Sequence, residues 1–357
     1  MLFRSPGSFY NEVIMKKTAV LILFVIFSAV IGYGYFKYSA YSNFKKTPVN
    51  IELSKTVEIK KGESWKKVSQ ILEESGIIRD REMFYWMIKE KKWDNALKTG
   101  EFDFSGEMTP VNVAERIMSG KVKLYSLTIP EGYNKYDAAN VFSGIDWIKG
   151  SENFLEICHD KNFLNSIGAK GKQSCEGLLF PSTYHFPKGV DIIAVMTKMA
   201  SQMKAVLKKY ENEMGRLDLD AYDFLKLASI IEKETGVKEE QPMIASVFLN
   251  RQRIGMKMQT DPSVIYGLLP KFTGNLTRKD LMTDHPWNTY TRYGFPATPL
   301  CFPGEGAIKS IVYPDDTKYL YFVATGKGYH YFSKTLVEHN AAVEHYQVKG
   351  LRTKFNY

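Results

Sequence analysis

Two glutamates lie at the end of a predicted helix in the stretch LASIIEKETG, residues 227–236. At about 100° per residue, Glu234 falls about 20° from Leu227, inside the apolar face, whereas Glu232 falls about 140° away, at its margin. A carboxyl group on the apolar face loses hydration, which raises its pKa and suits it to general acid catalysis. The residues alone leave a second interpretation open, in which the helix ends here and Glu234 is solvated.

The elements around this helix belong to a mixed α+β region, residues 123–357. An amphipathic helix is predicted over residues 191–214, and a β-hairpin over residues 318–333, where two β-rich runs flank the turn TGKG. The segment 261–306 is rich in Gly, Pro, Asn and Thr and is expected to hold little regular structure. Long irregular segments of this kind usually line or cover a functional site.

An uncharged stretch, Thr18–Phe36, is long enough to span the hydrocarbon core of a membrane. We expect a transmembrane anchor over residues 18–38, and the positive-inside rule favours residues 1–17 in the cytoplasm. A cleaved signal peptide is the alternative, but the stretch is long and ends in aromatic residues. No second span is predicted, so the rest of the chain is expected on the outer side of the cell (inner) membrane.

Residues 39–54 are expected to form a short polar stalk, and residues 55–122 a small module. Within the module the sequence predicts the order strand, helix, helix, strand, helix. Asp80 and Thr109 are predicted as the N-caps of its second and third helices. The boundary with the larger region is placed near residue 122.

Composition excludes several classes of protein. Hydrophobic residues make up 44% of the chain and charged residues 24%, which is typical of a folded globular protein. The net charge of +9 is spread without a dense basic block, so we expect no nucleic-acid-binding surface. Cys158, Cys175 and Cys301 form no ligand pattern with histidine, and no metal or cofactor is expected. One cysteine pair could close in an oxidising compartment, and the sequence leaves open which one.

Long motifs in the second region resemble the YceG-like family of endolytic murein transglycosylases. They are EGLLFPSTYHFP (176–187), LASIIEKETG, IASVFLNRQRIGMKMQTDPSVIYGL (244–268) and the stretch from WNTYTRYGF to EHN (287–340). The layout is also similar to the family's: one N-terminal anchor, a small module that resembles LysM, and a catalytic domain over residues 123–357. The resemblance therefore implies an α+β fold with a LysM-like module.

The family implies cleavage of peptidoglycan glycan strands between N-acetylmuramic acid and N-acetylglucosamine, which leaves 1,6-anhydro ends. Its catalytic residue is a glutamate of the E-K-E-T motif, and the second acid of that motif is Glu234 here, the residue that helical periodicity also selects. One glutamate acts as acid and then as base, because the attacking hydroxyl belongs to the substrate. A non-catalytic wall-binding scaffold and a muramidase that uses water remain open alternatives. The family also implies a periplasmic catalytic domain that acts beside peptidoglycan synthases and terminates strand growth.

Further polar residues in these motifs are candidates to hydrogen-bond sugar hydroxyl and N-acetyl groups. They are Glu176, Gln259, Thr260, Asp261, Asn288, Thr289 and Tyr290. The alternative for Asp261 is an Asx-type turn, and for Glu176 a structural salt bridge. His339, on a helix expected after the hairpin, is predicted to pack or to cap rather than to act in catalysis.

Overall fold

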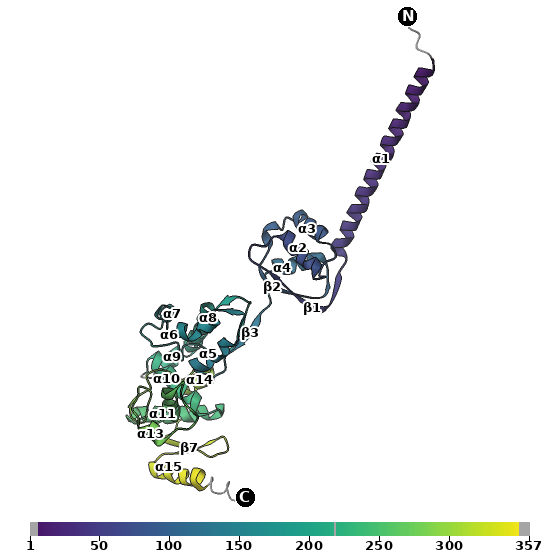
Figure 1. Cartoon of the computed structure of the whole chain (residues 1–357). Coiled ribbons are helices and arrows are strands. Elements are labelled where there is room, and N and C mark those ends of the chain that lie inside the picture. The colour runs from purple at the N-terminus through teal and green to yellow at the C-terminus, as the bar shows by residue number, and fades with distance from the viewer. Residues whose placement is uncertain (1–5, 218, 350–357) are drawn as a thin grey trace. The chain divides into compact units, whose positions relative to one another are not determined.

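The computed structural model (Figure 1) describes most of the chain, and the residues outside the described part are 1–5, 218 and 350–357. The predicted cytoplasmic segment and the end of the predicted catalytic domain therefore fall partly outside it. Contacts within the chain form two compact units, Met1–Leu124 and Tyr125–Tyr357. This division lies two residues beyond the boundary expected from the sequence.

A single helix, α1 (Pro6–Lys46), contains the whole of the predicted anchor, residues 18–38. Its segment Lys17–Lys46 is long and apolar enough to cross a membrane, and its apolar window is not buried against the rest of the protein. The helix does not stop where the stalk was expected, and the chain then enters strand β1 (Val49–Ile59). The prediction of a separate stalk was wrong, because Tyr41 and Phe44 pack against the core of the first unit and hold the end of α1 there.

The first unit has the predicted order of elements after α1, and we call β1 to α4 the N-terminal module. The elements that follow β1 are α2 (Trp65–Glu74), α3 (Arg81–Glu90), the 3-10 turn η1 (Asp94–Ala96), β2 (Gly100–Met108) and α4 (Pro110–Met118). Asp80 accepts a hydrogen bond from the backbone N–H of Met83, and Thr109 accepts one from Asn112, so both predicted N-caps are confirmed. β1 and β2 pair antiparallel, and the helices cover an apolar core.

The second unit is mixed α+β, as expected, with helices predominating. Its elements are β3 (Tyr125–Thr128), α5 (Lys135–Ser143), β4 (Ile148–Lys149), η2 (Ser151–Asn153), α6 (Phe154–His159), α7 (Lys161–Ser166), β5 (Thr183–Phe186), β6 (Val190–Asp191), α8 (Ile192–Lys209), α9 (Glu211–Met214), α10 (Ala221–Glu234), η3 (Lys238–Glu240), α11 (Gln241–Arg253), α12 (Asp261–Leu268), α13 (Arg278–Met282), α14 (Glu305–Val312), β7 (Tyr321–Ala324), β8 (His330–Ser333), α15 (Leu336–Val343) and the π-helical turn η4 (Glu344–Lys349). The strands pair two by two: β3 with β5 and β7 with β8 antiparallel, and β4 with β6 parallel.

Two predictions for this unit differ from the structure, while the predicted hairpin is confirmed as β7 and β8. The long helix expected over 191–214 is interrupted at Tyr210, which separates α8 from α9. The segment expected to be irregular contains α12, α13 and the start of α14. α12 begins with Asp261 and Pro262, and proline suits the first turn of a helix because its missing N–H would have no partner there.

Helix α10 lies in the middle of the second unit's core. Phe224, Leu227 and Ile231 are completely buried, which confirms the apolar face predicted for this helix. The helix packs against α11, α12 and α14. Its last residue is therefore held by tertiary contacts on several sides, which fixes the position of the glutamate that ends it.

Candidate active site

Glu234 ends α10, and its side chain lines a cavity of about 400 Å³. The side chain is only partly exposed. Burial raises the pKa of its carboxyl group to about 7, with a further rise from Asp261, while a hydrogen bond from Thr260 and the charge of Arg251 oppose the rise. The interpretation of a freely solvated Glu234 does not fit this environment. Near neutral pH the carboxyl group exists in both protonation states.

Thr260 holds this carboxyl group in place. Its hydroxyl donates a hydrogen bond to Oε1 of Glu234. Its own backbone N–H donates to Oγ1 of Thr289 at 3.1 Å, and that oxygen lies 2.8 Å from Oγ of Ser263. Thr260 and Thr289 are both buried. Neither residue lines the cavity, so the prediction that Thr260 and Thr289 bind sugar was wrong. They instead position Glu234 and the start of α12 from beneath the cavity surface.

Three of the predicted binding residues line the cavity itself. They are Gln259, Asp261 and Tyr290. The Tyr290 hydroxyl donates to Oδ1 of Asp261 at 2.6 Å, so the two side chains form one polar wall. Gln259 has a left-handed backbone conformation, with φ of 48°, where the chain turns into α12. This wall presents hydroxyl, carboxylate and amide groups next to Glu234.

The cavity lining also includes four residues that the sequence analysis did not select for the site. They are Arg251, Tyr321, His330 and His339. The Arg251 guanidinium is buried, and it donates to the carbonyl oxygens of Leu320, at 2.6 Å, and of Met258. Its positive charge is thereby fixed beside Glu234.

A sequence signal for Arg251 did exist. At about 100° per residue, Arg251 lies about 20° from Ile244 around α11. It therefore shares a face of the helix with Ile244 and Phe248, which are both completely buried. The periodicity argument that selected Glu234 therefore applies equally to this arginine. His339 stacks on Tyr321, with 5.3 Å between ring centroids, which agrees with the predicted packing role, although it also lines the cavity.

Glu176 does not reach the cavity. It is completely buried, and its Oε2 accepts hydrogen bonds from the Tyr266 hydroxyl at 2.7 Å and from the Lys135 backbone N–H at 3.1 Å. Burial raises the pKa of its carboxyl group to about 7. A side chain without exposed surface cannot contact a sugar, so the prediction of a binding role was wrong. Through Tyr266, Glu176 supports α12, the helix that follows Thr260.

Asn288 is also completely buried and away from the cavity. Its amide nitrogen donates to the carbonyl oxygens of Leu281, at 3.1 Å, and Thr283, at 2.7 Å. Its Oδ1 accepts from the backbone N–H of Tyr290 at 2.8 Å. Direct sugar binding by Asn288 was therefore a wrong prediction. The residue instead shapes the loop that presents Tyr290.

The other glutamate of the motif, Glu232, faces a different hollow. Its Oε2 accepts a hydrogen bond from the backbone N–H of Gly304 at 3.1 Å, and burial raises its pKa. The hollow also contains Glu131 and Lys238, which form an ion pair at 2.8 Å. The two acids of E-K-E-T therefore lie in separate environments, and Glu232, placed at the margin of the apolar face by helical periodicity, is half-buried as well.

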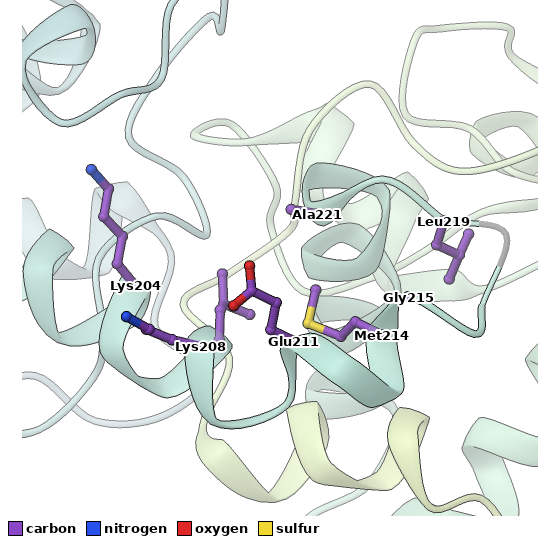
Figure 2. A pocket seen from close by; sticks show the side chains of 8 residues that line it. Lys204, Lys208, Glu211, Met214, Gly215, Leu219 and Ala221 are labelled. Carbon is purple, nitrogen blue, oxygen red and sulfur yellow. The ribbon is translucent and has the colours of Figure 1, made fainter.

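A third hollow, of about 470 Å³, lies where α8, α9 and the start of α10 meet, and Figure 2 shows its lining. Lys204, Lys208 and Glu211 contribute charged groups, and Met214 and Leu219 contribute apolar surface. None of the predicted site residues lines it. Among the described residues, no group of three or more His, Cys, Asp or Glu side chains is arranged to hold a metal ion.

Comparison with known proteins identifies the family. The sequence profile of the YceG-like family matches residues 57–345. The chain belongs to the YceG-like family. Its fold is similar to the crystal structure of a YceG-like protein from Listeria monocytogenes, with a TM-score of 0.56 and 33% sequence identity over 81% of this chain and 98% of that one.

Two relatives of this YceG-like protein carry the name endolytic murein transglycosylase. The one from Bacillus subtilis (strain 168) is 30% identical over 319 residues, which cover 84% of this chain and 85% of the relative. The one from Streptococcus pneumoniae serotype 2 (strain D39) is 27% identical over 365 residues, which cover 93% of this chain and 66% of the relative. The resemblance seen in the sequence motifs is confirmed.

Proposed function

We propose that this YceG-like protein is an endolytic peptidoglycan transglycosylase, which cleaves between N-acetylmuramic acid and N-acetylglucosamine and leaves 1,6-anhydro ends. The observation that carries this proposal is the Glu234 carboxyl group, whose pKa is raised to about 7 in a polar cavity. The similarity to proteins named endolytic murein transglycosylase over most of both chains supports it.

One carboxyl group is sufficient for the proposed reaction. Protonated Glu234 donates its proton to the bridging glycosidic oxygen as the bond from that oxygen to C1 of the muramic acid breaks. The resulting carboxylate then accepts the proton of the muramic C6 hydroxyl, whose oxygen forms a new bond to C1. No water is consumed, and Glu234 ends with its proton restored.

The neighbours of Glu234 suit both of its roles. Burial favours the protonated form that starts the reaction, whereas Arg251 and the Thr260 hydroxyl stabilise the carboxylate that must persist until the second proton transfer. A pKa near 7 gives a residue that donates and then accepts a proton at neutral pH. Gln259, Asp261 and Tyr290 are proposed to hydrogen-bond the sugar rings.

We also propose that α1 is a single-pass anchor with its N-terminus in the cytoplasm and the second unit outside the cytoplasm. The disulfide between Cys158 and Cys175 supports this, since such bonds persist in oxidising compartments. The N-terminal module is proposed to be LysM-like and to bind glycan strands. Recovery of the intact chain as soluble cytosolic protein would refute the anchor.

The test is digestion of purified peptidoglycan by the full-length protein in detergent, with products read by mass spectrometry. Wild type and Glu232→Gln should both release anhydro ends, whereas Glu234→Gln should release none. Reducing ends from the wild type would instead identify a muramidase that uses water. Anhydro ends at an undiminished rate from Glu234→Gln would refute the assignment, and no products from any variant would favour a scaffold.

A further inference from the structure

A hollow of about 620 Å³ lies between the end of α1 and helix α3, within the first unit. Tyr38, Tyr41, Met83 and Trp86 give it an aromatic and apolar lining. The Trp86 side chain is 65% exposed although it belongs to a folded module with its own core. Tryptophan combines a large apolar ring with a polar N–H, and such rings gather at the interface between membrane and water.

The position of the hollow along α1 corresponds to the headgroup layer of a bilayer. The uncharged stretch of α1 ends at Phe36, and the next two residues, Lys37 and Tyr38, already line the hollow. Tyr41 lies five residues past Phe36, which is about 7–8 Å along a helix axis. The polar layer on each side of the hydrocarbon core is about 5–8 Å thick. The α1 wall of the hollow therefore lies at headgroup depth when the uncharged stretch spans the core.

The other wall of the hollow is attached to this part of α1. The Tyr41 hydroxyl donates a hydrogen bond to the Glu90 carboxylate at the end of α3, and Lys45 Nζ donates to both oxygens of the same group at 3.0 and 3.1 Å. Tyr41 and Phe44 also pack against the core of the unit. These contacts keep α3, and with it Trp86, at the level of the end of the anchor.

The charges of the lining indicate which membrane component fits. Two basic residues, Lys37 and Lys89, are offset by the three acids Asp80, Glu82 and Glu90. A site for anionic lipid would carry an excess of Lys or Arg. One of these acids, Glu90, is already paired with Lys45, so the lining is close to neutral as well as aromatic. Such a lining suits zwitterionic headgroups and the first carbons of their acyl chains.

We propose that this hollow is a membrane-interface site, in which Trp86 lies among zwitterionic phospholipid headgroups and the N-terminal module rests on the bilayer surface. The inference depends on the proposed anchoring by α1 and is independent of the reaction at Glu234. It predicts that the contact survives high salt and does not need anionic lipid.

The test uses the full-length protein in phosphatidylcholine vesicles, with flotation as the first measurement. Tryptophan emission is then compared in vesicles with and without phosphatidylcholine brominated near the headgroup end of its acyl chains. The chain has five tryptophans, so the loss of emission caused by bromine should be about one fifth of the total. Trp86→Phe should abolish this loss. Trp65→Phe is the matched control, because Trp65 belongs to the same module but is buried. This variant should keep the loss, which becomes about one quarter of the emission because one of the five tryptophans has been removed.

Equal quenching in wild type and Trp86→Phe would overturn the inference, as would no quenching in protein that floats with the vesicles. In either case the hollow faces water or another protein. Protein that fails to float would refute the anchor and this inference with it. Activity on purified peptidoglycan would be unaffected by these outcomes, so a failure here is distinguishable from a failure of the proposed reaction.

Discussion

Replacing Glu234 with glutamine should abolish activity and at the same time stabilise the protein at alkaline pH. The pKa of this carboxyl group is raised from 4.5 to about 7, mainly by burial, so its ionised form is disfavoured in the folded state. At about 1.4 kcal/mol per unit of pKa, the shift of the pKa from 4.5 to about 7 corresponds to about 3 kcal/mol of stability. This is an upper value, because the side chain keeps some exposure.

The sign of the effect follows from proton binding. Below pH 4.5 the carboxyl group is neutral in both the folded and the unfolded chain, and ionisation costs nothing. Between pH 4.5 and about 7 the unfolded chain releases a proton that the folded protein keeps, so the free energy of unfolding falls as pH rises. Glutamine does not ionise, and its Oε1 can still accept the hydrogen bond from Thr260. The advantage of the variant should therefore grow across this interval and then level off.

The assay is urea denaturation of wild type and Glu234→Gln in the same detergent, at pH values of about 4, 6 and 8. Comparing the two proteins at each pH cancels the contributions of other titrating groups to stability. One such group is Glu176, whose pKa is also raised to about 7. The control is Glu239→Gln, a change of the same kind at an exposed site five residues further on, which should show little dependence on pH. A stability difference between wild type and Glu234→Gln that is the same at pH 4 and pH 8 would refute the reasoning.

Three further predictions concern the support of the site. Thr260→Val removes the hydroxyl that donates a hydrogen bond to the Glu234 carboxyl group, the proposed catalytic group. Because a hydrogen bond to a charged group is worth about 1.5–3 kcal/mol, this variant should release anhydro ends at least about tenfold more slowly, whereas Thr260→Ser should retain most of the rate. A wild-type rate in the valine variant would contradict this. Glu176→Ala leaves the buried Tyr266 hydroxyl without its acceptor. The free energy of unfolding, measured by urea denaturation, should fall by about 1–3 kcal/mol. An unchanged midpoint would contradict the structural role of Glu176. Cys158→Ser opens the disulfide to Cys175 and should lower the free energy of unfolding by about 3 kcal/mol. Wild type treated with reductant should lose a similar amount, and an unchanged stability in both proteins would contradict the prediction.

Local sequence rules determined the features that depend on neighbours in the chain. The 3.6-residue period placed Glu234 on the apolar side of its helix and Glu232 at the margin of that side. Glu234 lines the cavity as predicted, whereas Glu232 is half-buried in a second hollow. The N-caps Asp80 and Thr109 and the turn TGKG were readable because each acts within a few residues. The uncharged stretch of α1 was equally clear, since its signal is length and composition alone.

Only the tertiary structure decided which polar residues of the motifs reach the cavity. Glu176 and Asn288 have the same polar character as Gln259 and Asp261, yet the first two are completely buried and the others line the cavity. Their difference depends on segments that are distant in sequence, such as the contact of Glu176 with Tyr266, 90 residues away.

The rest of the cavity lining also depends on segments that are distant in sequence. Arg251 on α11, Tyr321 on β7 and His339 on α15 meet beside Glu234 only when these elements pack together. The sequence by itself determined the inward direction of Glu234, because helical periodicity is a local property. The raised pKa of Glu234 comes from burial by distant segments, and burial is a property of the packed chain. The opposing charge of Arg251 is likewise brought beside Glu234 by packing.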